Sequence, residues 1–306
     1  MPKIFIDANK YLEFYQSARI SELIELLIAL KDELVVTEQI VHEVHRNRVN
    51  VTLRFLNQSW VEKAYRYSVP EYLLSVDEAE RKDLAMSLDD VNAKCNAAYR
   101  RISELRVKTL KAITDGSDEV TSLLATIFAD AASASDEELT RARIRKERGD
   151  PPGKRADPLG DQLSWEQFLS RIKGEKVLWL ITGDSDYRYK LPDKSLTLNP
   201  VLAGDIKMAT LVETEIRCFE TLTEGLSDAS RELARAPKKS IEPEELRKIK
   251  EAELAQAAMS KVPVIICPSC GGASSLQIVR SAQGYINQIL FFTCPHCGAK
   301  FDSGGE

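Results

Sequence analysis

Two CPxC motifs near the C-terminus constrain the fold of this chain more than any other feature. They hold four of its six cysteines, and twenty-three residues separate them. Each CPxCG segment forms a tight turn whose backbone amides can donate to thiolates, and two such turns make a tetrahedral zinc site. The predicted ligands are Cys267, Cys270, Cys294 and Cys297. A module of residues 263–306 is too small for a sufficient hydrophobic core, so we expect a β zinc ribbon with structural Zn²⁺.

Other interpretations of the cysteines carry less weight. A redox-active dithiol needs one CxxC pair, and two mirrored pairs are unnecessary for it. The role of the ribbon stays open, since nucleic-acid binding, docking of a partner protein and self-association all fit. Cys95 and Cys218 stand alone in helical patterns and are predicted to be small buried hydrophobes.

Length and composition describe an ordinary globular protein. The chain has 306 residues, of which 43% are hydrophobic and 29% charged, enough for a full-sized domain and a small second one. A net charge of −5 argues against a surface coated with positive charge for non-specific nucleic-acid binding. Uninterrupted apolar runs are short, and the N-terminus leads into a strand. We expect no membrane span, no signal sequence and a cytoplasmic location.

Short apolar runs indicate an α/β domain. Residues 4–6 form a buried strand that ends at Asp7, residues 33–37 a second strand, and residues 175–182 the most apolar strand. A helical period occupies residues 10–31. Strands that alternate with helices predict a parallel sheet.

Composition divides the chain into three parts. Residues 1–225 form the first domain, with a long helix-rich insertion at about residues 60–147. Residues 226–262 read as a charged linker whose best helix is Glu242–Met259. The ribbon of residues 263–306 follows.

Four acids stand at strand ends or on the helices that follow. Asp7 and Asp184 follow predicted strands, Glu43 lies on the helix after the second strand, and Asp161 begins a helix. Each alone is explained by a helix cap, a turn or a solvated carboxylate. Together, at one edge of a parallel sheet, they would repel unless a divalent cation neutralised them. Oxygen ligands of this kind suit Mg²⁺ or Mn²⁺.

A cluster of cations precedes Asp161. Seven lysines and arginines fall within residues 141–155, which otherwise read as a solvated helix face and loop. Leading directly into an acid of the site, they are candidates for contacts with nucleic-acid phosphates. The residues predicted to make these phosphate contacts are Arg145, Arg148, Lys154 and Arg155. Trp165, at helical spacing with Leu163 and Leu169, is predicted to lie in the core.

Four segments together carry a family resemblance. "IFIDANKYLEFY", "VVTEQIVHEVHRN", "GDQLSWEQFL" and "WLITGDSDY", in that order, resemble the acidic motifs of PIN-domain ribonucleases. The run "PPGKRADPLGDQLSWEQFL" resembles a PIN-like branch with a long helical insertion. The resemblance spans residues 1–225 and implies a parallel-sheet sandwich.

The resemblance also implies an activity. Such enzymes cleave RNA with Mg²⁺ or Mn²⁺ and leave a 3′-hydroxyl and a 5′-phosphate, and the toxins among them have an antitoxin partner. The implied metal ligands are Asp7, Glu43, Asp161 and Asp184. Asn9 would help hold Asp7, Thr182 would place a hydroxyl in the pocket, and Asp186 would be an auxiliary ligand.

Alternatives to an endoribonuclease remain at this point. Related folds use the same acids in structure-specific DNA nucleases, and a PIN-like scaffold can serve as a non-catalytic adaptor. A receiver or phosphatase-like fold is disfavoured, because the phosphatase pattern needs an aspartate where this chain has Asn9. His42 and His45 are expected in ordinary surface or packing roles. Oligomeric state, antitoxin and pathway (toxin, RNA processing or defence) are left open.

Overall fold

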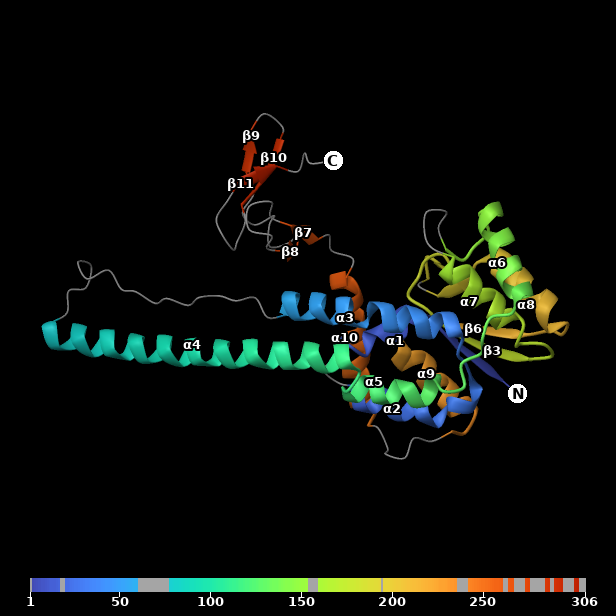
Figure 1. Cartoon of the computed structure of the whole chain (residues 1–306), viewed down its shortest axis with the longest axis horizontal. Coiled ribbons are helices and arrows are strands. Elements are labelled where there is room, and N and C mark those ends of the chain that lie inside the picture. Colours follow the sequence, from blue (N-terminus) through green and yellow to red (C-terminus); the bar gives the residue numbers. More distant parts are fainter. Residues whose placement is uncertain are drawn as a thin grey trace.

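The computed structural model contains an α/β body from which one long helix projects (Figure 1). It describes residues 2–16, 20–59, 77–153, 159–193, 195–235 and 242–260. Beyond residue 260 it describes the strands at 264–266, 273–275, 284–286, 289–293 and 300–302.

A four-stranded parallel sheet forms the centre of the body. Its strand order is β2-β1-β3-β6, with β1 at Lys3–Ile6, β2 at Leu34–Val35, β3 at Val177–Ile181 and β6 at Glu215–Phe219. The chain passes from β1 to one neighbour and later to the other, so the order reverses between β1 and β3. Open parallel sheets bind ligands at the carboxyl end of such a switch point. The predicted parallel sheet is confirmed.

Helices cover both faces of the sheet. Successive side chains of a strand point to opposite faces, and the successive residues Phe5 and Ile6 are both fully buried. Phe5 faces α7 (Gly160–Leu169), where its ring lies 5.0 Å from that of Phe168. Ile6 pairs in register with Ile181, which faces α9 (Leu222–Glu232). A Cβ on Gly225 of α9 would stand 2.4 Å from Ile181, so only glycine permits this close approach.

The insertion consists of three capped helices in its described part: α4 at Glu78–Asp115, α5 at Glu119–Phe128 and α6 at Asp136–Arg148. Gly116 ends α4 with φ 70°, a conformation that costs glycine least. Ser135 and Glu138 form a capping box at the start of α6. The remaining helices of the body are α1 at Ala8–Glu13, α2 at Ile20–Ala29, α3 at Glu38–Ser59 and α8 at Pro200–Thr210.

Several elements differ from their predicted bounds. The helical period of residues 10–31 is divided between α1 and α2. Between β3 and α9 the chain forms a hairpin of β4 (Arg188–Lys190) and β5 (Leu196–Leu198), then α8 and β6, none of which was assigned from sequence. The helix predicted in the linker is α10, Pro243–Ser260, and its Glu253 hydrogen-bonds to the first residues of α9. No described helix combines the length and apolar character that a membrane span needs.

The C-terminal strands are short and antiparallel. Residues 264–266 and 273–275 pair as β7 and β8, and residues 284–286, 289–293 and 300–302 pair as β9, β10 and β11. The four zinc-site cysteines lie outside the described residues. Cys95 and Cys218, predicted to be small buried hydrophobes, are both half-buried; Cys218 packs against the core and lies on β6 instead of a helix.

Candidate active site

Asp7 and Asp184 come after the neighbouring parallel strands β1 and β3, so both acids lie at the carboxyl edge of the sheet. Asp7 follows β1 and is 5% exposed. It occupies the N-cap position of α1 but makes no side-chain capping hydrogen bond, which removes the ordinary explanation for this acid. The Thr182 hydroxyl, one residue after β3, donates to Asp7 Oδ2 at 3.2 Å and accepts from the Asp184 amide at 3.0 Å. One threonine thus ties the two acidic segments together.

Glu43 and Asp161 approach from the helices. Glu43 is half-buried on α3, and Asp161 lies in the first turn of α7. A Cβ on Gly160 would stand 2.7 Å from Gln39 and 3.6 Å from Glu43 Oε2, so glycine allows α7 to begin directly against α3. Burial, and then the charge of Asp161, raise the pKa of Glu43.

Tyr187 lies within the electrostatic reach of all four acids. It is 1% exposed, and its ring packs 5.8 Å from Trp165 and 6.0 Å from Phe5. Burial raises the pKa of its phenol well above the usual value. The negative charges that add to this rise are those of Asp7, Asp161, Asp184 and Glu43. The four predicted acids therefore all lie within electrostatic reach of one buried phenol, Tyr187, which the sequence did not single out.

The carboxylates of the site raise one another's pKa. The pKa of Asp7 is raised to about 6 by burial, then by Glu43 and Asp184, while the Thr182 hydrogen bond opposes the rise. Of the described residues, no three His, Cys, Asp or Glu side chains are gathered tightly enough to form a ready-made metal site. Carboxylate oxygens are the ligands that hard divalent cations prefer, and a bound cation would reduce the repulsion between the carboxylates.

The auxiliary residues fall in different places. Thr182 is buried and hydrogen-bonds both the Asp7 carboxylate and the Asp184 amide. Asn9 is exposed on α1, so Thr182 does the holding of Asp7 that was expected of Asn9. The Asp186 amide donates to Asp184 Oδ1 at 3.0 Å, and this hydrogen bond closes a turn that contains both acids. His42 and His45 are exposed on α3, in agreement with surface roles.

A buried ion pair that the sequence did not reveal lies beside the acids. Lys10 Nζ contacts Glu13 Oε1 at 2.6 Å, and the lysine side chain is 3% exposed. Burial raises the pKa of Glu13 to about 7, Lys10 opposes that rise, and the charges of Glu253 and Asp7 add to it. A Cβ on Gly183 would stand 3.3 Å from Lys10 Cε, which places the lysine under the loop that carries Asp184.

The basic segment divides into a structural part and an exposed part. Arg145 is 10% exposed and contacts Glu166 Oε1 and Asp205 Oδ2, both at 2.8 Å. It also donates to the carbonyl of Pro151 at 2.7 Å. Arg145 therefore ties α6, α7 and α8 together and has little surface left for nucleic acid. Lys154 and Arg155 lie outside the described residues.

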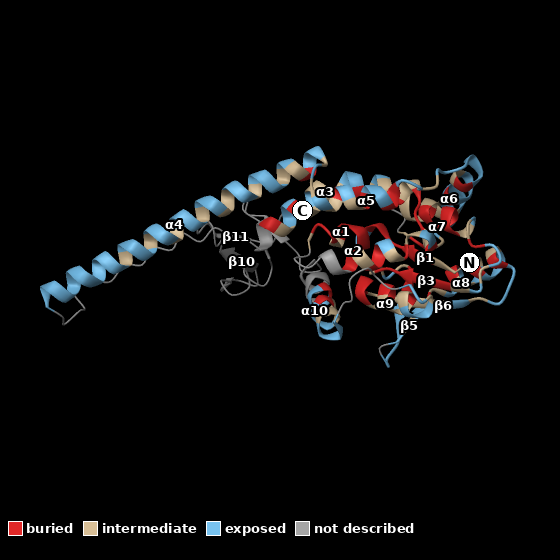
Figure 2. Ribbon diagram, turned by 90° about the horizontal axis from the view of Figure 1, so that it is seen from below, coloured by how far each residue is buried: buried red, intermediate tan, exposed pale blue. Residues whose placement is uncertain are grey.

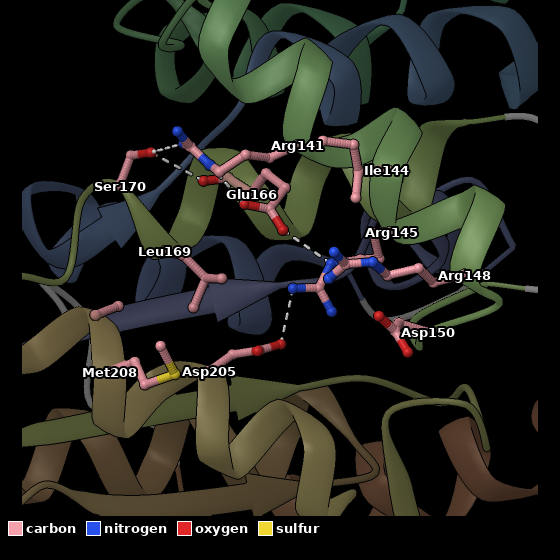
Figure 3. A pocket seen from close by; sticks show the side chains of 11 residues that line it. Arg141, Ile144, Arg145, Arg148, Asp150, Glu166, Leu169, Ser170, Asp205 and Met208 are labelled. Carbon is pink, nitrogen blue, oxygen red and sulfur yellow. Dashed lines mark hydrogen bonds and ion pairs between the residues drawn. The ribbon is translucent and has the colours of Figure 1, made fainter.

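A cavity of about 580 Å³ lies between α6, α7 and α8. Figure 3 shows Arg145 held between Glu166 and Asp205 in its middle, with Arg148 and Asp150 at one end. Arg148 is exposed. Trp165 is fully buried, as predicted, and its indole donates to Asp205 Oδ2 at 3.2 Å.

Comparison with known proteins supports this description of the fold. Residues 3–200 match the model of the family described as PIN like domain, which spans β1, the insertion, α7 and β3 with all four acids. Neither curated proteins nor solved structures gave a significant match. PIN-like domains belong to a nuclease-type superfamily, whose members typically use divalent metals. Since the match covers more than half of the chain, this protein belongs to the PIN like domain family.

Proposed function

We propose that this protein is a metal-dependent endoribonuclease. The observation that carries the proposal is that four carboxylates from four separate segments lie close enough to buried Tyr187 for their charges to raise its pKa, with Asp7 and the Asp184 segment joined through Thr182 at the switch point of the sheet. Asp7 and Asp184 supply ligands from the strand ends, and Glu43 and Asp161 supply them from α3 and α7. A Mg²⁺ or Mn²⁺ ion bound there would lower the pKa of an attacking water and stabilise charge on the transferring phosphoryl group.

The chain's own residues prepare that site. Thr182 orients Asp7 by hydrogen bonding, and the turn formed by the Asp186 amide fixes Asp184. Tyr187 is buried within electrostatic reach of all four acids and packs against Trp165 and Phe5. Arg148 and the segment that includes Lys154 and Arg155 supply cations for the phosphates that flank the scissile bond.

A cleavage assay on matched single-stranded RNA and DNA tests the proposal. The full-length protein should cut RNA with Mg²⁺ or Mn²⁺, leave 5′-phosphate and 3′-hydroxyl ends, and stop in EDTA. Asp7→Asn and Asp161→Asn should lose at least 100-fold in rate and keep the wild-type circular dichroism. Glu147→Gln, at an exposed carboxylate of α6, is the matched control. If both variants are folded and cut at the wild-type rate, the assignment of the four-carboxylate site is wrong. Cleavage of DNA alone would mean that the substrate is DNA.

We further propose that residues 263–306 bind one structural Zn²⁺ through Cys267, Cys270, Cys294 and Cys297. The two motifs stand in the sequence between β7 and β8 and between β10 and β11. Purified protein should carry about one equivalent of zinc, and Cys267→Ser should release it. Protein that holds no zinc, or a Cys267→Ser variant that retains it, would contradict this assignment.

A further inference from the structure

The projecting helix α4 exposes an apolar stripe that the described body leaves uncovered. Figure 2 shows α4 running out from the body with exposed or half-buried residues along its length, and its one buried residue is Ile113, near the body. Its 38 residues span about 57 Å at 1.5 Å per residue. In proteins most helical stability comes from packing of an apolar face against another element, and most of α4 lacks such packing within the described body.

The apolar residues of α4 follow a heptad spacing. Steps of four and three residues connect Leu84, Leu88, Val91, Cys95, Ala98, Ile102 and Leu105. A repeat of 3.5 residues on one helix is the pattern of a coiled coil, since it keeps a narrow seam facing the partner. Leu84, Val91 and Leu105 are 37%, 43% and 47% exposed, so the seam is open to a second helix.

The two halves of α4 carry opposite charge. Residues 77–93 contain six acids and two cations, and residues 94–111 contain six cations and one acid. Two copies aligned in parallel would place acid against acid and base against base. Two antiparallel copies would place each acidic half along the partner's basic half, and symmetric homodimers require the same surface on both copies.

We propose that α4 is the dimerisation element of this protein and pairs with the α4 of a second copy as an antiparallel coiled coil. In the register that pairs the seam residues between positions 88 and 105 with one another, Leu88 lies opposite the partner's Leu105, and Val91 opposite the partner's Ile102. The two-fold axis then passes between residues 96 and 97. The two bodies stand at opposite ends of the shared coil. This inference does not depend on nuclease activity.

Solution mass and point variants test the interface. The full-length chain of 34.3 kDa should run at twice that mass in light scattering. Val91→Glu with Leu105→Glu should halve the mass, because both substitutions place charge in the seam, and the folded body should stay intact by circular dichroism. Val107→Glu, at a position 67% exposed and outside the seam, is the matched control and should leave a dimer. A monomeric wild type, or a dimer that survives the seam variants, overturns the proposal.

Cross-linking tests the orientation. In this register the two Cys95 residues lie three residues apart along the axis, roughly 4.5 Å, so a short bismaleimide should join them. In a Cys95→Ser background, Leu88→Cys alone should give no cross-link at α4, whereas Leu88→Cys with Leu105→Cys should give one that peptide mapping places between these two positions. A Leu88→Cys protein that cross-links to itself at residue 88 would mean a parallel coil and overturn the antiparallel assignment.

Discussion

The Thr182 hydroxyl donates a hydrogen bond to the carboxylate of Asp7 at 3.2 Å, across 175 residues of sequence. The same oxygen accepts the amide of Asp184 at 3.0 Å. Thr182 is 1% exposed, so this contact is shielded from water. A buried hydrogen bond of this kind fixes the orientation of a carboxylate and favours its charged form. The threonine after β3 therefore controls the acid after β1.

Thr182→Val should weaken metal binding and cleavage while leaving the fold intact. Valine fills the same volume but cannot donate, so Asp7 loses its orienting bond and its pKa rises further. Loss of a partner that orients a metal ligand costs roughly 10- to 100-fold in metal affinity or activity. The measurement is the Mn²⁺ concentration that gives half-maximal cleavage. Thr182→Ser keeps the hydroxyl and should stay near wild type; equal behaviour of the two variants would remove the role given to this bond.

Asp7 should make the metal-free protein less stable as the pH rises. Its pKa is raised from 3.8 to about 6, so between these values the folded state binds more protons than the unfolded state. Stability then falls as pH rises through this window, by at most about 3 kcal/mol for this group. Urea unfolding in EDTA from pH 4 to pH 7 measures the slope. Asp7→Asn should flatten it; a variant with an unchanged slope would show that other carboxylates cause the effect.

Arg145 and Arg148, on the same helix, should give opposite results when replaced by alanine. Arg145→Ala leaves Glu166, whose side chain is 6% exposed, without one of its two arginine contacts. Breaking a buried ion pair costs about 3–5 kcal/mol, so denaturant unfolding should shift clearly. Arg148→Ala should change stability by less than about 0.5 kcal/mol but weaken RNA binding and reduce its salt dependence. A stable Arg145→Ala protein with impaired binding would reverse the two roles.

Those two arginines also show what a sequence can and cannot predict about this site. Both are cations in one basic run, and nothing local distinguishes them. Their difference comes from Glu166 and Asp205, which lie 21 and 60 residues away from Arg145 and reach it only in the folded chain. The burial of Tyr187 and of Lys10 has the same origin, because it depends on which elements pack over them.

Features encoded locally were predicted correctly. Residues 4–6 and 177–181 are buried β-strands because short, continuous apolar runs suit the middle of a parallel sheet. The acids that follow such runs lie at the carboxyl edge by topology alone, which is why Asp7 and Asp184 could be paired before the fold was known. The part of the sheet beyond residue 200 was missed, since β6 is only half-buried and mixes charged with apolar residues.

Glu253 of α10 should hold that helix against the body. Its carboxylate, 8% exposed, accepts the amides of Leu222 at 2.9 Å and Thr223 at 3.1 Å, and the Thr223 hydroxyl as well. These donors belong to the first turn of α9, where amides lack partners within the helix and a negative charge is favourable. Burial raises the pKa of Glu253, and the Thr223 hydrogen bonds and the charge of Lys10 oppose the rise.

Glu253→Ala should therefore release α10, because it leaves two buried amides without an acceptor. Each lost bond of this kind costs about 1–3 kcal/mol, and hydrogen exchange in α10 should accelerate accordingly. Glu251→Ala is the matched control, since the Glu251 side chain is 62% exposed and forms a surface ion pair with Arg247 at 3.3 Å. Similar exchange rates in the two variants would mean that other contacts hold α10. Release of α10 would also remove the charge of Glu253, which is one of those that raise the pKa of Glu13.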